Sequence, residues 1–325
     1  MAQPVLEVRN LRIEFATRRG AVVAVDDLSF GIGRGEILGV VGESGAGKSL
    51  TGNAVIGLLQ PPGRIAGGSI HLGGERIDGL PEARMRSIRG RRVGAIFQDP
   101  LTSLDPLFTV GSQLVETILA HLPLSRAEAR ARALALLNEV GIPAPEARID
   151  QYPHQLSGGM RQRVVIALAL AGEPELIVAD EPTTALDVSV QAQINNLLKR
   201  LCRERGTGIM LITHDMGVIA EIADRVVVLY AGRVVEIGAV EDLLRRPQHP
   251  YTAALMGSIP SLERKAERLA QIDGAMPRPG HLPPGCAFHP RCPSRGGRCA
   301  TSRPELLPTG GSASACWLTQ GGTAA

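Results

Sequence analysis

The 325-residue chain lacks any long hydrophobic run. No apolar stretch approaches the roughly 18 residues that indicate a membrane-spanning helix. The first residues, MAQPVLEVRN, also lack the hydrophobic segment of a signal peptide. We therefore expect a soluble, cytoplasmic protein.

A strong charge of either sign is absent as well. Lys and Arg total 35 and Asp and Glu total 32, so the net charge is +3. This value is too small to indicate nucleic-acid binding, and no nucleic acid is expected as a partner. Sustained heptads are missing between residues 50 and 156, which excludes a long coiled coil. Hydrophobic residues make up 44% of the chain, enough for a substantial core in one large domain or two smaller ones.

Cysteine is scarce over most of the chain. Cys202 stands alone in a predicted helix, where a small buried thiol is expected. The other four cysteines lie together in a late segment rich in proline and glycine: Cys286, Cys292, Cys299 and Cys316. Disulfides are disfavoured because nothing indicates export from the cytoplasm. Four thiolates suit Zn²⁺ or an iron–sulfur cluster, although the close C-x₂₋₄-C pairs that are usual at structural zinc sites are missing.

The most informative motif is GESGAGKS, which follows the apolar segment EILGVV and precedes a predicted helix, KSLTGNAVIGLL. Its spacing fits the phosphate-binding loop G-x-x-x-x-G-K-S/T. The glycines allow a sharp turn that directs backbone N–H groups toward phosphate at the start of the helix. Lys48 is predicted to reach the β- and γ-phosphates, and Ser49 to bind Mg²⁺. The predicted nucleotide-binding residues of this loop are Gly42, Glu43, Ser44, Gly45, Ala46, Gly47, Lys48, Ser49 and Leu50.

Strands and helices alternate along most of the chain. Strands are expected at residues 5–15, 22–32, 93–98, 174–182 and 208–215, and a hairpin is expected to turn at Ala231-Gly232. Helices are expected at residues 125–141 and 189–206, the second with Val190, Ile194, Leu197 and Leu201 on one face. This alternation predicts an α/β fold with a largely parallel sheet and crossover helices.

The helix expected at residues 125–141 has a clear start. Ser125 and Glu128 fit a capping box. Apolar residues that recur at helical spacing predict its buried face: Ala127, Ala131, Leu134 and Leu137.

The strand PELIVADEP ends in two acidic residues, Asp180 and Glu181. Ligands of α/β sheets collect at the carboxyl ends of strands. Asp180 is predicted to hold Mg²⁺, directly or through water, and Glu181 to orient or deprotonate an attacking water. Taken alone, the two acids could equally cap the helix that follows.

The segment LSGGMRQR, residues 156–163, resembles the signature motif of ATP-binding cassette (ABC) ATPases. Its Ser-Gly-Gly opens a helix whose free N–H groups and positive dipole end suit a γ-phosphate. Met160 stands where the family more often has Gln, a change that leaves the phosphate-binding amides in place. The resemblance assigns five residues to a partner's ATP: Leu156, Ser157, Gly158, Gly159 and Met160.

The other motifs of that family follow in the family's order. Gln98 begins a segment that resembles the Q-loop and is assigned to Mg²⁺. Residues 185–187, ALD, resemble the D-loop with its Asp187. His214 resembles the switch histidine and is assigned a catalytic role beside Glu181. Phe15 lies where the family places an aromatic that stacks on adenine, although it could equally be a core residue of its strand.

The resemblance implies a mechanism that requires two cassettes. In cassette ATPases the phosphate loop and the signature face different nucleotides, and two cassettes pair head to tail. This chain has one cassette, so the resemblance implies a dimer in which residues 157–159 complete the partner's site.

A finer resemblance extends over nearly the full length. The segments IFQDPLTSLDPLFTVGSQLVE, HPYTAALMGSIP and GCAFHPRCPSRGGRCATSRPELL are similar to ATP-binding subunits of dipeptide and oligopeptide importers. This implies an ATP hydrolase that drives import from the cytoplasmic face of the cell membrane as a peripheral subunit. The implied partners are a second, related ATPase chain, two membrane-spanning permease subunits and an extracytoplasmic solute-binding protein. Nickel, glutathione or another peptide-like solute is an alternative cargo, and a non-transport ATPase acting on nucleic acid or ribosomes is a less favoured alternative.

The resemblance also divides the chain. It implies an ABC ATPase domain at residues 1–246, with a helical subdomain at about 100–170, and a C-terminal region at 247–325. It assigns a 4Fe–4S cluster to the four late cysteines, with Zn²⁺ as the alternative. Such a cluster would be structural because ATP hydrolysis needs no redox step. We therefore expect replacement of Cys292 by Ser to loosen the tail while leaving the nucleotide affinity of the phosphate loop nearly intact.

Overall fold

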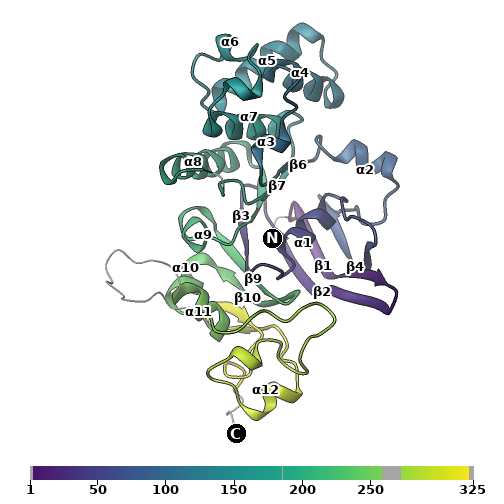
Figure 1. Cartoon of the computed structure of the whole chain (residues 1–325), viewed down its shortest axis with the longest axis vertical. Coiled ribbons are helices and arrows are strands. Elements are labelled where there is room, and N and C mark those ends of the chain that lie inside the picture. Colours follow the sequence, from purple (N-terminus) through teal and green to yellow (C-terminus); the bar gives the residue numbers. More distant parts are fainter. Residues whose placement is uncertain (1–2, 185, 258–271, 322–325) are drawn as a thin grey trace. The chain divides into compact units, whose positions relative to one another are not determined.

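The computed structural model describes residues 3–184, 186–257 and 272–321 (Figure 1). The chain forms two compact units. The first unit contains Gly79–Leu211, Gly33–Glu36 and the N-terminal residues up to Val5. The second contains Leu6–Ile32, Ile37–Asp78 and the chain from Ile212 onward. Within the described residues, no helix is both long and apolar enough to cross a membrane.

An antiparallel sheet at the start of the second unit confirms the first two predicted strands. Its order is β2-β1-β4-β5. Leu11 and Ile13 of β1 are fully buried, because one face of the sheet packs on the core. The strands are β1 (Leu6–Thr17), β2 (Gly20–Ile32), β4 (Gly63–Leu72) and β5 (Glu75–Arg76).

The second unit also contains strands in the order β11-β12-β10-β9-β3. β3 pairs in parallel with β9, with Val40 opposite Val227. β12 pairs antiparallel with β10, so the chain near its C-terminus covers backbone groups of β10 that would otherwise form an open edge. The bounds are β3 (Ile37–Val41), β9 (Arg225–Tyr230), β10 (Arg233–Ala239), β11 (Leu307–Thr309) and β12 (Ser312–Ser314).

The hairpin predicted at Ala231-Gly232 joins β9 to β10. Both residues have positive φ, 49° and 80°, as a tight two-residue turn requires. A side chain at Gly232 would place its Cβ 2.2 Å from the carbonyl oxygen of Ala24. The Gly232 N–H donates to the carbonyl of Ala46 at 3.0 Å, so the turn also fixes a residue of the predicted phosphate loop.

The short helices of the second unit lie between and after these strands. They are α1 (Lys48–Val55), α9 (Met216–Ile222), α10 (Val240–Arg245), α11 (Pro250–Gly257), η2 (His289–Arg291) and α12 (Gly297–Thr301). Tyr251 of α11 and Phe288 before η2 are almost fully buried. The late segment rich in proline and glycine therefore shares the core of this unit.

The first unit contains three strands, β6 (Val93–Ile96), β7 (Leu176–Asp180) and β8 (Gly208–Ile212), in the order β8-β7-β6. β6 and β7 run parallel, as predicted. The helices of this unit are α2 (Glu82–Ile88), α3 (Pro100–Ser103), α4 (Val110–His121), α5 (Arg126–Glu139), α6 (Pro145–Arg148), η1 (Pro153–Gln155), α7 (Gly158–Leu170) and α8 (Val188–Arg205).

The start of α5 confirms the predicted capping box, with both bonds between Ser125 and Glu128 present. The predicted buried face is wrong at Ala127 and Ala131, which are exposed, whereas Leu137 is buried as predicted and Leu134 is half-buried. The other buried residues of the helix are Ala129, Ala133 and Leu136. Alanines occur on every side of this helix, so the larger residues near its end decide which face packs.

The helix α8 agrees better with its pattern. Ile194, Leu197 and Leu201 are buried, and Val190 is half-buried. Cys202 is fully buried, as expected of a small structural thiol. The domain boundary expected after residue 246 stays a prediction.

Replacing Gly232 would cost stability in two ways, through steric overlap of the new Cβ and through backbone strain at positive φ. A second glycine allows the two contributions to be measured separately. Gly79 has nearly the same φ, 82°, but only open space where a Cβ would lie, so Gly79→Ala is the matched control. We expect Gly79→Ala to lower the free energy of unfolding by about 1 kcal/mol. Gly232→Ala should lower it by roughly 3 kcal/mol or more, because the Ala24 carbonyl must move as well. Urea titrations of both variants test this, and equal losses would contradict the steric argument.

Candidate functional site

The predicted phosphate loop follows β3 directly and leads into α1, as expected. Gly42 has a φ of 149°, and a Cβ there would lie 2.3 Å from the carbonyl oxygen of Leu229. Gly47 caps α1 with a φ of 102°. The loop therefore depends on glycine at both ends, once for a close approach to β9 and once for the turn into the helix.

The predicted phosphate-contacting lysine lies against the loop itself. Lys48 is 8% exposed, and its Nζ donates to the carbonyls of Gly42 at 2.7 Å and Glu43 at 3.1 Å. Ser49, the predicted Mg²⁺ ligand, is exposed in the first turn of α1. A buried ammonium at the start of a helix makes this loop attractive to an anion.

Glu43, at the second position of the loop, contacts residues that the sequence analysis did not assign. Its backbone N–H donates to the hydroxyl of Tyr251 at 2.9 Å. Its carboxylate accepts two hydrogen bonds from the guanidinium of Arg291, at 2.6 and 2.9 Å. All three residues belong to the second unit, so this unit supports the loop from the C-terminal part of the chain.

The other predicted residues of the second unit are His214 and Phe15. His214 is exposed between β8 and α9, and Asp215 caps α9 by accepting from the N–H of Gly217 at 2.7 Å. Phe15 is half-buried on β1, and its ring covers Gly63, where a Cβ would lie 2.9 Å from Phe15 Cε1. Its role in adenine stacking stays a prediction.

In the first unit, the predicted acids lie at the carboxyl end of β7. Glu181 follows Asp180 with a φ of 48°, a strained value for a residue with a side chain. The Glu181 carboxylate accepts from Gln98 Nε2 at 3.2 Å and from the Thr184 hydroxyl at 2.8 Å. The structure therefore brings together three predicted residues, Gln98, Asp180 and Glu181, and uses the Gln98 amide nitrogen to hold Glu181 in place.

The signature motif forms the start of α7. Ser157 caps the helix by accepting from the N–H of Met160 at 3.3 Å, and Leu156 before it is buried. A Cβ at Gly159 would lie 2.7 Å from Val190 Cγ1, so this position also lets α7 and α8 approach closely. Gly158 and Ser157 are exposed, which leaves the helix N-terminus accessible.

The predicted D-loop residue Asp187 caps α8. Its carboxylate accepts from the N–H groups of Val190 at 3.0 Å and Ser189 at 3.1 Å. The bond from Val190, together with the Ser189 hydroxyl, holds the pKa of Asp187 below its usual value. Ala185 of the same motif lies outside the described residues.

The four late cysteines lie around one small cavity of the second unit, which Phe288 and Trp317 also line. All four are free thiols. Burial is the main cause that raises the pKa of Cys286 to about 11, and the other three cysteines act in the same direction. As placed, however, no group of three or more His, Cys, Asp or Glu side chains in the described residues could hold a metal ion. The structure supports the convergence of the donors and does not show a formed metal site.

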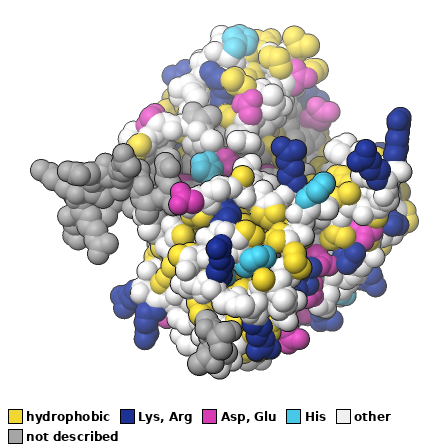
Figure 2. Space-filling model, turned by 60° about the horizontal axis from the view of Figure 1, so that its bottom comes forward, with side chains coloured by type: hydrophobic (Ala, Val, Ile, Leu, Met, Phe, Trp, Pro, Cys, Tyr) yellow, Lys and Arg dark blue, Asp and Glu magenta, His cyan; other side chains and the backbone are white. Residues whose placement is uncertain are grey.

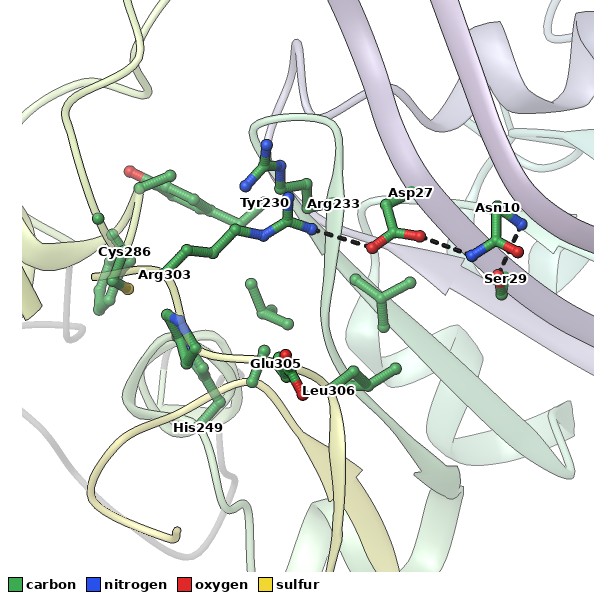
Figure 3. A pocket seen from close by; sticks show the side chains of 17 residues that line it. Asn10, Asp27, Ser29, Tyr230, Arg233, His249, Cys286, Arg303, Glu305 and Leu306 are labelled. Atoms are coloured by element: carbon green, nitrogen blue, oxygen red, sulfur yellow. Dashed lines mark hydrogen bonds and ion pairs between the residues drawn. The ribbon is translucent and has the colours of Figure 1, made fainter. Parts of the chain in front are cut away.

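A larger cavity of about 570 Å³ borders the same region (Figure 3). Tyr230, His249 and Cys286 lie along one side of it. From the same side, the Arg303 side chain reaches across to Asp27 and pairs with it at 3.3 Å, and Asp27 accepts from Asn10 at 2.7 Å. These polar side chains bind one another and join the C-terminal region to β1 and β2. Figure 2 shows Lys and Arg side chains scattered over one face of the molecule rather than gathered in one patch.

His249 is a buried residue that the sequence analysis did not assign. It is 1% exposed, and its Nδ1 accepts from the N–H of Tyr251 at 3.0 Å. Its backbone N–H donates to the carboxylate of Glu236 at 2.9 Å. Burial lowers the pKa of His249 to about 3, so the imidazole is neutral and can accept. The sequence offered one indirect sign of this buried cluster. The chain has only three tyrosines, and two of them, Tyr230 and Tyr251, contact each other beside His249.

Comparison with known proteins gives two family matches. A family described as ABC transporter matches residues 25–184, and one described as oligopeptide/dipeptide transporter, C-terminal region, matches residues 235–299. The oligopeptide transport ATP-binding protein AppD of Bacillus subtilis is 48% identical over 303 residues, 93% of this chain and 92% of that protein. The dipeptide transport ATP-binding protein DppD of the same organism is 47% identical over 318 residues, 97% of this chain and 95% of that protein.

Solved structures agree with the fold. A dimeric ATP-binding cassette in a post-hydrolysis state, bound to ADP and Pi, superposes with a TM-score of 0.64 at 30% identity, covering 72% of this chain and 98% of that one. The protein cbiO1 of Clostridium perfringens, part of an ABC transporter complex, gives a TM-score of 0.65 at 28% identity, covering 75% and 92%. The expected α/β cassette fold is confirmed.

The low pKa of His249 makes folding stability depend on pH. An unfolded histidine takes up a proton below about pH 6.5, whereas folded His249 stays neutral until about pH 3. Stability should therefore fall as the pH falls from about 6.5, by up to about 1.4 kcal/mol per pH unit. We expect His249→Gln to lose about 1–2 kcal/mol less than the wild type between pH 7 and pH 5. Urea titrations at both pH values measure this, and parallel losses would contradict it.

Proposed function

This chain belongs to the ATP-binding proteins of the oligopeptide/dipeptide ABC transporter family, and we propose that it is the ATP-hydrolysing subunit of a peptide importer. The observation that carries the proposal is the near-full-length match to ATP-binding proteins named for oligopeptide and dipeptide transport. That match includes the C-terminal region, which separates these proteins from cassettes in general. We keep the division at residue 246/247 as part of the proposal.

Within this function, the phosphate loop binds ATP and Lys48 neutralises the β- and γ-phosphates. Its position supports this role, since a buried ammonium already lies along the loop carbonyls. Ser49, Gln98 and Asp180 hold Mg²⁺, and the carbonyl oxygen of the Gln98 amide is the atom suited to the metal. Phe15 stacks on adenine.

Glu181 orients or deprotonates the attacking water, and His214 acts with it in catalysis. The Glu181 carboxylate is supported in this role by the hydrogen bonds from Gln98 and Thr184, which fix its direction. Asp187 and the signature residues Leu156–Met160 serve the ATP of a second cassette. The exposed N-terminus of α7 supports this assignment, because a helix start binds anions.

The protein works with partners at the cytoplasmic face of the cell membrane. The proposed assembly contains a second, related ATPase chain, two membrane-spanning permease subunits and an extracytoplasmic solute-binding protein that delivers peptide. The solved dimeric cassette to which this chain is similar supports pairing of two cassettes.

The four late cysteines hold a 4Fe–4S cluster, with Zn²⁺ as the alternative. The donor set supports this, because four free thiols line one cavity and four thiolates are the usual ligands of such a cluster. A positive metal centre would also stabilise the thiolate of Cys286, whose pKa burial now raises. The group would supply a cross-link in a segment with few apolar residues, and Cys286, Cys292, Cys299 and Cys316 would bind it.

The catalytic assignment is tested in the reconstituted importer. Glu181→Gln should bind ATP as tightly as the wild type but hydrolyse it on the order of 10²- to 10³-fold more slowly, because only water activation is removed. Lys48→Ala should lose ATP affinity itself, because phosphate charge is no longer neutralised. Both should abolish ATP-driven uptake of a labelled dipeptide. Glu146→Gln, an exposed acid on α6, is the matched control and should behave as the wild type.

Wild-type ATP hydrolysis by Glu181→Gln would refute the role of that carboxylate. Uptake of nickel or glutathione in place of peptide by an active complex would refute the proposed cargo and leave the ATPase assignment intact.

The cysteine assignment is tested by anaerobic purification. A brown protein with visible absorption and about four irons per chain is expected. Cys202→Ser, which changes a buried thiol outside the cluster, should keep the iron, whereas Cys299→Ser should lose most of it. A colourless protein with one zinc per chain would overturn the cluster and keep the four-cysteine site.

A further inference from the structure

The C-terminal region reaches the phosphate loop through one buried arginine. Both terminal nitrogens of Arg291 donate to the carboxylate of Glu43, at 2.6 and 2.9 Å, in a bidentate ion pair. The Arg291 side chain is only 5% exposed, and that of Glu43 is 30% exposed. This pair is therefore better shielded from water than an ordinary surface salt bridge.

The guanidinium of Arg291 is fixed on its other sides as well. Its Nε donates to the carbonyl of Asp273 at 2.8 Å, and Nη2 donates to the carbonyl of Ile272 at 3.1 Å. Nη1 also donates to the hydroxyl of Tyr230 at 3.3 Å. Because these bonds fix the plane of the Arg291 guanidinium, the guanidinium holds the Glu43 carboxylate in one orientation.

Three groups of Glu43 form hydrogen bonds: its carboxylate, its backbone N–H and its carbonyl. Arg291 binds its carboxylate, Tyr251 accepts its backbone N–H at 2.9 Å, and Lys48 donates to its carbonyl at 3.1 Å. Burial raises the pKa of Tyr251, so its hydroxyl is neutral and available as the acceptor. The second position of the phosphate loop therefore has little freedom to change its backbone direction.

The segment that contains Arg291 lies between Cys286 and Cys292, two of the four late cysteines. Residues 287–291 run from Cys286 to Cys292 and end in η2. Phe288 packs against Tyr230 and Tyr251, with ring centroids 5.2 and 5.3 Å apart. The cysteine segment and the loop contacts thus share one aromatic core.

We propose that Arg291 is a positioning residue for the nucleotide site: through Glu43 it holds the phosphate loop and neutralises a carboxylate beside the phosphates. Without Arg291, Glu43 would bring an unpaired negative charge next to the bound nucleotide. Nucleotide affinity consequently depends on Arg291 of the C-terminal region, a dependence that the sequence analysis did not predict. The inference rests on the proposed role of the phosphate loop in binding ATP.

The test compares affinities of the full-length chain for a fluorescent ATP analogue with Mg²⁺. Arg291→Met should weaken binding on the order of tenfold, because the loop loses both its orientation and its charge balance. Arg291→Lys keeps the positive charge but loses the two-pronged guanidinium contact. Its nucleotide affinity should lie between those of the wild type and Arg291→Met. Arg295→Met is the matched control, since Arg295 is exposed four residues after Arg291 and donates to the carbonyl of Pro290 at 3.1 Å. It should bind as the wild type.

A second change separates charge and positioning from general loss of structure. Adding Glu43→Gln to Arg291→Met removes the unpaired carboxylate and should recover much of the lost affinity, so the double-mutant cycle shows strong coupling. Far-UV circular dichroism and thermal unfolding identify any variant that fails to fold, in which case Arg291→Lys with Glu43→Gln carries the comparison. Wild-type affinity in folded Arg291→Met, or a double variant no better than the single one, would overturn the inference. If Lys48→Ala also bound normally, the role of the loop itself would fail instead.

Discussion

The backbone of the phosphate loop is the constraint around which the second unit is arranged. Gly42 must pass so close to the Leu229 carbonyl of β9 that no side chain fits. A loop bent this tightly presents its amides only if its flanks are held. The β3–β9 pairing holds one flank, the Gly232 turn holds Ala46, and the C-terminal region holds Glu43.

The C-terminal region reaches this position with few apolar residues. It adds β12 to the edge of β10, and it contributes Tyr251 and Phe288 to a core that Tyr230 of β9 completes. His249 orients α11 because burial keeps its imidazole neutral, and the Glu236 carboxylate binds the N–H groups of Gln248 and His249. Polar groups that would be costly if buried alone therefore satisfy one another.

In the first unit, two helix caps and one residue with a strained backbone fix the positions of the candidate site residues. Ser157 and Asp187 cap α7 and α8, so two family motifs also serve as helix starts. Glu181 has a left-handed backbone conformation directly after β7, and Gln98 from the end of β6 fixes its carboxylate. Strain of this kind is kept where neighbouring contacts determine the conformation, which is common at functional sites.

The sequence by itself determined the elements and most of the candidate site. Glycine spacing predicted the tight loop between β3 and α1, alternation predicted β1 and β2, and Ser125 with Glu128 marked the start of α5, because each depends on residues close together in the chain. Ala127 and Ala131 were wrongly placed on the buried face of α5 because alanine is small enough for either face. Only the tertiary structure decided that Arg291, some 250 residues after Glu43, would bind it. A bond between segments so distant leaves no periodic or local pattern, since its geometry depends on how β9, α11 and η2 pack together.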